Sequence, residues 1–240
     1  MNNTKKIVIV SMALTFSASL LAQTEGFYVA GQLGASQQVK DSEPYGNNIA
    51  VDDDFPATFD IDNSAVGSLG IGYILDKNIR VEGRIGYRDS DFNATRFGTG
   101  TRAGEEYILK GSVESTTFTI EGFYDFTNDS AFTPYIKAGI GMSDNSYSAK
   151  LGGSGVAAFD PFDGAADGYY DSYADGDSTE FTWNFGVGVS YELSEQTSIY
   201  GEYQYASFGD AMTGQDSFTD GFKIDNLATN EVVIGIRITL

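Results

Sequence analysis

The chain has 240 residues, of which 14 are Lys or Arg and 34 are Asp or Glu, and it contains no His and no Cys. Without these two residue types it cannot build Ser-His-Asp or Cys-His catalysis, thiol chemistry or a Cys-ligated zinc site, so we expect neither an enzyme nor a bound cofactor. The formal net charge of −20 also argues against nucleic-acid binding, which needs a basic surface.

Residues 1–22 are typical of a secretory signal peptide. Lys5 and Lys6 precede an apolar stretch at residues 7–21, and Ala22 is small enough to stand before a cleavage site. The alternative is an N-terminal membrane anchor, although the apolar stretch is shorter than a spanning helix normally needs. Because Lys5 and Lys6 are two of the 14 basic residues, 12 remain in the exported chain.

After the signal peptide, apolar side chains alternate repeatedly with small, polar or charged ones. A period of two predicts β-strands. The pattern is clearest at residues 180–191, where Phe181, Trp183, Phe185, Val187, Val189 and Tyr191 share one face. In chain order, the predicted strands are residues 26–36, 64–75, 79–90, 112–126, 131–143, 180–191, 197–208 and 224–240.

Short and long connections alternate between these strands. Tight turns are predicted at residues 76–78, 127–130 and 194–196, and long loops at residues 37–63, 91–111, 144–178 and 209–223. Short periplasmic turns and long extracellular loops are typical of outer-membrane barrels, and closure removes the sheet edges that lipid would not tolerate. We therefore predict an all-β fold for residues 23–240, an eight-stranded antiparallel up-and-down transmembrane β-barrel with both termini in the periplasm.

Four stretches carry a resemblance to a known family: residues 26–34 (GFYVAGQLG), 70–73 (GIGY) and 134–141 (PYIKAGIG), and the final alternating strand. They resemble the transmembrane domain of the outer-membrane protein A family and the opacity-protein-like porin family, over residues 24–240. The resemblance implies a barrel in the outer membrane of a Gram-negative bacterium. Its implied partners are membrane lipid, lipopolysaccharide and the barrel-insertion machinery.

Two departures from that family bear on function. Leu240 stands where the family usually ends in Phe, which is expected to weaken recognition by the insertion machinery. The peptidoglycan-binding domain that outer-membrane protein A carries after its barrel is absent, so cell-wall tethering is not expected. Because closure satisfies every strand, we expect a monomer.

The first candidate site is a set of charged side chains on the predicted inner face of the barrel. The basic members are Arg80, Arg84, Arg88, Lys137 and Arg237, and the acidic members are Glu82, Glu121, Glu202 and Glu231. Unpaired buried charge is costly, so we expect ion pairs. The set either fills the lumen as a salt-bridged plug or acts as a gate whose pairs rearrange to let ions pass; an eight-stranded barrel has no room for a wide pore.

The second candidate is the acidic loops. The first loop holds Asp41, Glu43, Asp52, Asp53, Asp54, Asp60 and Asp62; the third holds Asp144, Asp160, Asp163, Asp167, Asp171, Asp175 and Asp177, interleaved with Tyr169, Tyr170 and Tyr173. They form either a solvated acidic surface or sites for divalent cations that bridge to lipopolysaccharide phosphates, although neither loop has EF-hand spacing. The Tyr-Asp-Gly stretch is also typical of adaptable binding loops.

The third candidate is a set of outward aromatic side chains near strand ends, which predicts interfacial girdles; ligand stacking is the alternative. The set is Phe27, Tyr73, Tyr87, Phe118, Phe126, Phe181, Trp183, Tyr191, Tyr203 and Tyr205. Together these features predict a structural or surface-interaction role, such as adhesion or envelope integrity. The alternative is a small, weak, porin-like diffusion channel.

Overall fold

The computed structural model describes residues 26–39, 44–46, 57–98, 100–157, 164, 166, 168–173, 175–212, 214, 222–224 and 226–240. The predicted signal peptide and much of the acidic loops lie outside these residues. Eight long strands form the barrel: β1 (Phe27–Gln38), β4 (Ser64–Ile74), β5 (Ile79–Phe97), β6 (Glu106–Asp125), β7 (Phe132–Gly152), β9 (Gly176–Ser194), β10 (Thr197–Ser207) and β13 (Ala228–Thr239).

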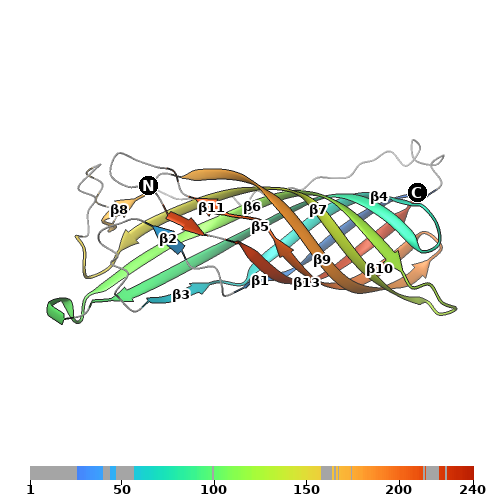
Figure 1. Ribbon diagram of the computed structural model, residues 1–240. Coiled ribbons are helices and arrows are strands. Elements are labelled where there is room, and N and C mark those ends of the chain that lie inside the picture. Colours follow the sequence, from blue (N-terminus) through green and yellow to red (C-terminus); the bar gives the residue numbers. More distant parts are fainter. Residues whose placement is uncertain are drawn as a thin grey trace.

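Each long strand pairs antiparallel with its neighbours, in the order β4-β1-β13-β10-β9-β7, and β5 and β6 complete the circle. The sheet therefore closes on itself, and the twisted, tilted strands wind around a common axis (Figure 1). This confirms the predicted eight-stranded antiparallel barrel. None of the helices in the described part of the chain has the length and apolarity to cross a membrane.

Five short strands and one helical turn complete the described elements. The short strands are β2 (Pro44–Gly46), β3 (Ala57–Ile61), β8 (Asp171–Ser172), β11 (Ala211–Met212) and β12 (Phe222–Ile224), and the turn is a 3-10 helix at Gly100–Arg102. β3 pairs with β5 and β8 with β7, so both lengthen the barrel wall. β11, β12 and β2 form a separate three-stranded sheet.

The three predicted tight turns lie at one end of the barrel with the C-terminus, and the β5–β6 hairpin projects from the other (Figure 1). Their sequences explain them. The Asp76 carboxylate accepts hydrogen bonds from the backbone N–H groups of Asn78, at 2.7 Å, and Ile79, at 2.9 Å. In the next turn the Asn128 side chain accepts from the Ser130 N–H at 2.8 Å. Such local side-chain bonds favour a tight reversal over strand continuation.

Four strands run further than the sequence pattern predicts. β5 continues to Phe97, β6 begins at Glu106, β7 continues to Gly152 and β9 begins at Gly176. The prediction of loops throughout residues 91–111 and 144–178 was therefore wrong in these parts. The predicted loops at 37–63 and 209–223 likewise contain β2, β3 and β11, and the last barrel strand begins at residue 228 rather than 224.

The cause is an inversion of polarity along the strands. Between Ile79 and Tyr87, β5 is apolar outside; beyond it, Asp89 and Asp91 face outward and Phe92 is buried inside. β6 and β7 change in the same way. A strand that leaves lipid for water needs a polar outer face and an apolar inner one, as in a soluble sheet. We call the added parts of β5, β6, β7 and β9 the extension. The extension is packed around its own core, formed by Phe92, Leu109, Val113, Tyr147, Ala149, Leu151, Tyr173, Ala206, Phe208, Ala211 and Leu227.

Closely packed tyrosine–glycine contacts line the inner wall nearer the turns. Tyr28, Tyr135 and Tyr200 point inward, and each ring lies across a glycine of an adjacent strand, namely Gly72, Gly188 and Gly235. A Cβ atom at Gly72 would lie 2.1 Å from the Tyr28 ring. Glycine at these positions therefore makes room for the aromatic layer of the lumen.

Candidate functional site: the charged lumen

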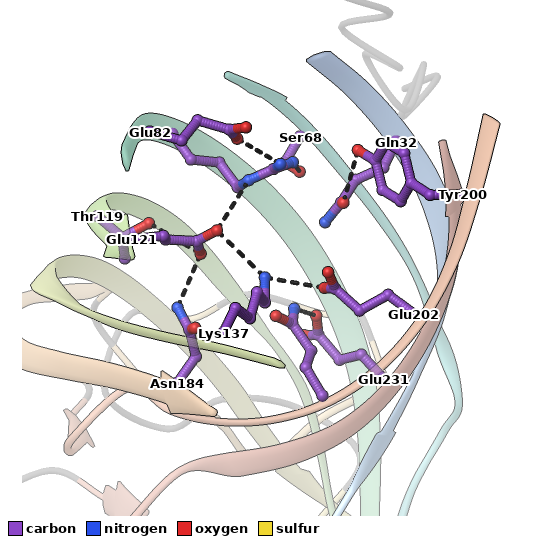
Figure 2. A network of polar contacts seen from close by, with 12 residues as sticks. Gln32, Ser68, Glu82, Thr119, Glu121, Lys137, Asn184, Tyr200, Glu202 and Glu231 are labelled. Carbon is purple, nitrogen blue, oxygen red and sulfur yellow. Dashed lines mark hydrogen bonds and ion pairs between the residues drawn. The ribbon is translucent and has the colours of Figure 1, made fainter. Parts of the chain in front are cut away.

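The central layer of the lumen is a chain of alternating charges. The Arg84 guanidinium contacts the Glu82 carboxylate and lies 3.2 Å from that of Glu121. The Lys137 ammonium lies 3.2 Å from Glu121 and 2.8 Å from Glu202. Glu121 therefore joins the two cations, and all five side chains are buried (Figure 2).

Neutral side chains fix the carboxylates of this layer. Asn184 donates to Glu121 at 2.9 Å, and the Tyr135 hydroxyl donates to Glu202 at 2.9 Å. Arg84 also donates to the Ser68 hydroxyl at 2.7 Å. Ser68, Tyr135 and Asn184 belong to β4, β7 and β9, so the network ties strands on different sides of the barrel (Figure 2). Buried ion pairs with satisfied partners rigidify a structure, because removing one member leaves the other uncompensated.

A second layer lies nearer the extracellular extension. Arg88 donates to Glu231 at 3.0 Å, and Thr229 donates to the same carboxylate at 2.9 Å. Gln204 also donates to Glu231. On its other side the Arg88 guanidinium lies 3.9 Å from the centre of the Phe208 ring. The Arg88–Glu231 pair therefore lies directly beneath the apolar core of the extension.

A third layer lies at the periplasmic end. Arg80 makes a two-point contact with Asp125, at 2.8 and 3.2 Å, and its guanidinium lies 4.0 Å from the centre of the Phe123 ring. Arg237 donates weakly to the Ser198 hydroxyl, at 3.4 Å, and is half-buried at the periplasmic opening of the barrel.

Sequence reasoning missed Asp125 as a member of this set. Alternation signals its position, because residue 125 shares the inner face with Glu121 and Phe123. With Asp125 added to the nine predicted residues, this set has five basic and five acidic side chains. The structure brings eight of the nine predicted residues into the ion pairs described above and leaves Arg237 beside them at the periplasmic opening.

The packed layers leave little free space. Two cavities near Arg88, of about 10 and 20 Å³, have room for single water molecules. Arg88 and Phe208 line both of them. In the part of the chain that the structure describes, charged pairs lie at the centre of the lumen, with aromatic rings below them and apolar side chains above.

The ten predicted girdle residues all lie on the outer surface, and Tyr205 is the least exposed of them. Several pack in pairs: Phe27 contacts Tyr73 edge to face, with ring centres 4.8 Å apart, and Trp183 packs at a tilt against Tyr205, at 5.4 Å. Phe132, which the sequence reading left out, packs at a tilt against Tyr191 at 4.8 Å. Between these aromatic residues the outer surface is aliphatic, and we call this zone the apolar belt. In it Ile120 and Ile234 are each 72% exposed, as lipid-facing residues would be.

Eight of the fourteen acidic residues named in the predicted loops lie outside the described part of the chain. Asp144 and Asp177 belong to β7 and β9 rather than to a loop, and both face outward. With Asp89, Asp91 and Glu114 they form an acidic band directly above the apolar belt. Among the described residues, no group of three or more acidic side chains is arranged to hold a metal ion.

Comparisons with known proteins agree with this architecture. The chain is 25% identical over 256 residues to the outer membrane protein PagN of Salmonella typhimurium strain LT2, covering 98% of each protein. The crystal structure of OprG from Pseudomonas aeruginosa is similar at a TM-score of 0.55 and 14% identity, over 90% of this chain and 97% of that one. Neisserial surface protein A (NspA) matches at a TM-score of 0.45 and 17% identity, over 90% and 97%.

A family model described as the outer membrane protein beta-barrel domain matches residues 8–235. The protein is therefore located in the bacterial outer membrane, in agreement with its lipid-facing belt. The chain belongs to the outer membrane protein beta-barrel family.

Proposed function

We propose that the protein is a closed barrel that carries an ordered extracellular platform for contact with other surfaces, as in adhesion. One observation carries the proposal: β5, β6, β7 and β9 continue beyond the lipid belt and enclose their own apolar core. A tilted strand needs about 9–11 residues to cross a bilayer, whereas these four have 19, 20, 21 and 19. Crossing the membrane therefore does not account for the added length.

The far end of the platform is held in a defined shape. Arg102 forms a salt bridge of 2.7 Å with Glu105 and donates to the Gly155 carbonyl at 3.1 Å, which joins the β5–β6 hairpin to the chain after β7. The hydrogen bond from Arg102 holds the pKa of Glu105 below its ordinary value, so the salt bridge persists into more acidic solution than an unshifted glutamate would allow. Such an end presents loops in a fixed arrangement, which lowers the entropy cost of binding a partner.

The filled lumen favours this role over the diffusion channel that the sequence left open. An ion would have to displace paired charges at the centre and packed side chains above them, with few waters to replace their contacts. A non-enzymatic role agrees with the absence of His and Cys. We also propose that the acidic band above the belt contacts lipopolysaccharide, a partner that the family resemblance implies. Divalent cations would bridge the two, because the carboxylates and the lipid phosphates carry the same charge.

The proposal predicts that removing the hairpin tip of the platform strongly reduces attachment. Gram-negative cells would express the full chain, or a chain whose hairpin tip at residues 98–105 is replaced by Asn-Gly, a favourable two-residue turn. We expect the full chain to raise attachment to cultured animal cells above vector level, and the trimmed chain to lose most of that gain. The matched control replaces residues 127–130, at the periplasmic end, in the same way. This control should keep the gain in attachment.

Folding of each variant would be checked by its heat-sensitive migration on gels, so that only folded barrels are compared. Attachment at vector level by the full chain, or full attachment by the trimmed chain, would contradict the proposal. Detergent sensitivity of the same strains separates a surface role from an envelope-integrity role. In the latter case the trimmed and full chains would protect equally.

A further inference from the structure

The chain leaves the barrel wall after β10 and folds into the extracellular mouth. The ladder pairs of β10 with β9 and β13 end at Ser207, which lies opposite Trp183 and Ala228. Two residues with positive φ mark the change of direction, Gly209 at 71° and Asn226 at 54°. We call residues 207–212 and 226–228 the mouth segment.

Inward-facing side chains of the wall hold the mouth segment by its backbone carbonyls. Ser143 and Asn145 of β7 donate to the Phe208 carbonyl at 2.6 and 2.8 Å, and Asn145 also donates to that of Asp210 at 3.0 Å. From β9, Thr182 donates to the Ser207 carbonyl at 2.6 Å and Ser178 to that of Asp210 at 2.8 Å. Four wall side chains therefore do what strand pairing does elsewhere in the barrel.

Below the mouth segment lies the smaller cavity, which is lined in part by Arg88, Ser115, Phe208 and Leu227. The Arg88 Nη1 atom and the Ser115 hydroxyl are buried and have no hydrogen-bond partner among the described residues, and both residues are more than nine-tenths buried. Unpaired buried donors cost free energy that water would relieve. Closure of the mouth is therefore favoured by the carbonyl contacts and apolar packing, and opposed by these two donors.

We infer that the mouth segment is a displaceable plug, a unit separate from the barrel wall that controls access from outside to the chamber above the Arg88–Glu231 pair. Ladder bonds join the barrel strands around the whole circle and end at Ser207 and Ala228. Beyond them, backbone bonds join the two arms of the segment to each other, at Phe208 and Leu227, and β11 to β12. The segment is held to β7 and β9 by side-chain hydrogen bonds worth roughly 1 kcal/mol each. It can move without breaking the closed sheet. The deeper charge network around Glu121 stays intact when it does.

The absence of Cys from the chain allows a direct test by single-cysteine labelling. Ser115→Cys would report on the chamber and Thr119→Cys on the layer beneath it, with a membrane-impermeant thiol reagent added outside proteoliposomes. We expect Ser115→Cys to react slowly in the native background. The double change Ser143→Ala and Asn145→Ala, which removes three of the carbonyl contacts, should raise its rate by about 10- to 100-fold.

Two controls keep the result interpretable. Lys110→Cys on the exposed outer face should react fast in both backgrounds, and Thr119→Cys should stay protected in both. An unchanged Ser115→Cys rate in folded double-alanine protein would overturn the inference. A parallel rise at Thr119→Cys would overturn it too, because the whole lumen would then have opened. Neither result depends on whether the platform supports attachment.

Discussion

Replacing Lys137 with methionine is expected to destabilise the folded barrel by about 3–5 kcal/mol. Lys137 is 2% exposed, and its ammonium is the cation that joins Glu121 to Glu202. Methionine fills a similar volume but leaves three buried carboxylates beside Arg84 alone. The measurement is urea unfolding of the barrel in lipid vesicles, followed by the fluorescence of Trp183, the single tryptophan, which lies on the lipid-facing surface.

Two further variants isolate charge from packing in that experiment. Lys77→Met removes the same side chain from an exposed periplasmic turn and should shift stability by no more than about 0.5 kcal/mol. Adding Glu202→Gln to Lys137→Met removes one of the uncompensated charges and should recover part of the loss. A cost below about 1 kcal/mol for Lys137→Met would mean that the central layer is hydrated rather than sealed.

Replacing Gly72 with valine should prevent normal assembly of the inner aromatic layer. A Cβ atom there would lie 2.1 Å from the Tyr28 ring, and Tyr28 is fully buried. Forcing side chains into a packed interior typically costs about 1–3 kcal/mol or more. The folded fraction after refolding into vesicles, read from heat-sensitive gel migration, should fall well below that of the native chain.

Gly122→Val is the matched control, because Gly122 faces outward and nothing lies within 4 Å of the added Cβ position. It should fold like the native chain. Combining Gly72→Val with Tyr28→Ala removes the clash and should restore much of the folded fraction. A native folded fraction for Gly72→Val alone would show that the Tyr28 ring moves aside freely and that the tyrosine–glycine contacts do not fix the wall.

The barrel could be predicted from the sequence because lipid imposes a strict pattern on its strands. Every apolar residue from Phe181 to Tyr191 must face outward, so alternation revealed both the strand and its orientation. The same alternation located the buried charges. Arg84 and Glu121 had to face a lumen too narrow for solvated ions, and the structure brings them within 3.2 Å.

The extracellular extension was harder to predict, since water replaces lipid there and reverses the pattern. At Asp89 and Asp144 the outward residues become acidic, which mimics the start of a loop. The inner face still alternates, with Tyr147, Ala149 and Leu151 buried, and that signal marks the strand continuation. The mouth segment could not be predicted in this way. Its position depends on contacts between Asn145 and Phe208, far apart in sequence, that no local periodicity encodes.

Single-channel recording of the refolded barrel in planar bilayers tests the central claim, a lumen closed by paired charges, most directly. The claim predicts no discrete conductance steps from the native chain at neutral pH, in recordings where a known porin conducts. Discrete steps from the native chain that grow larger in Arg84→Ala would contradict it, because the charged network would then be the gate of a working pore.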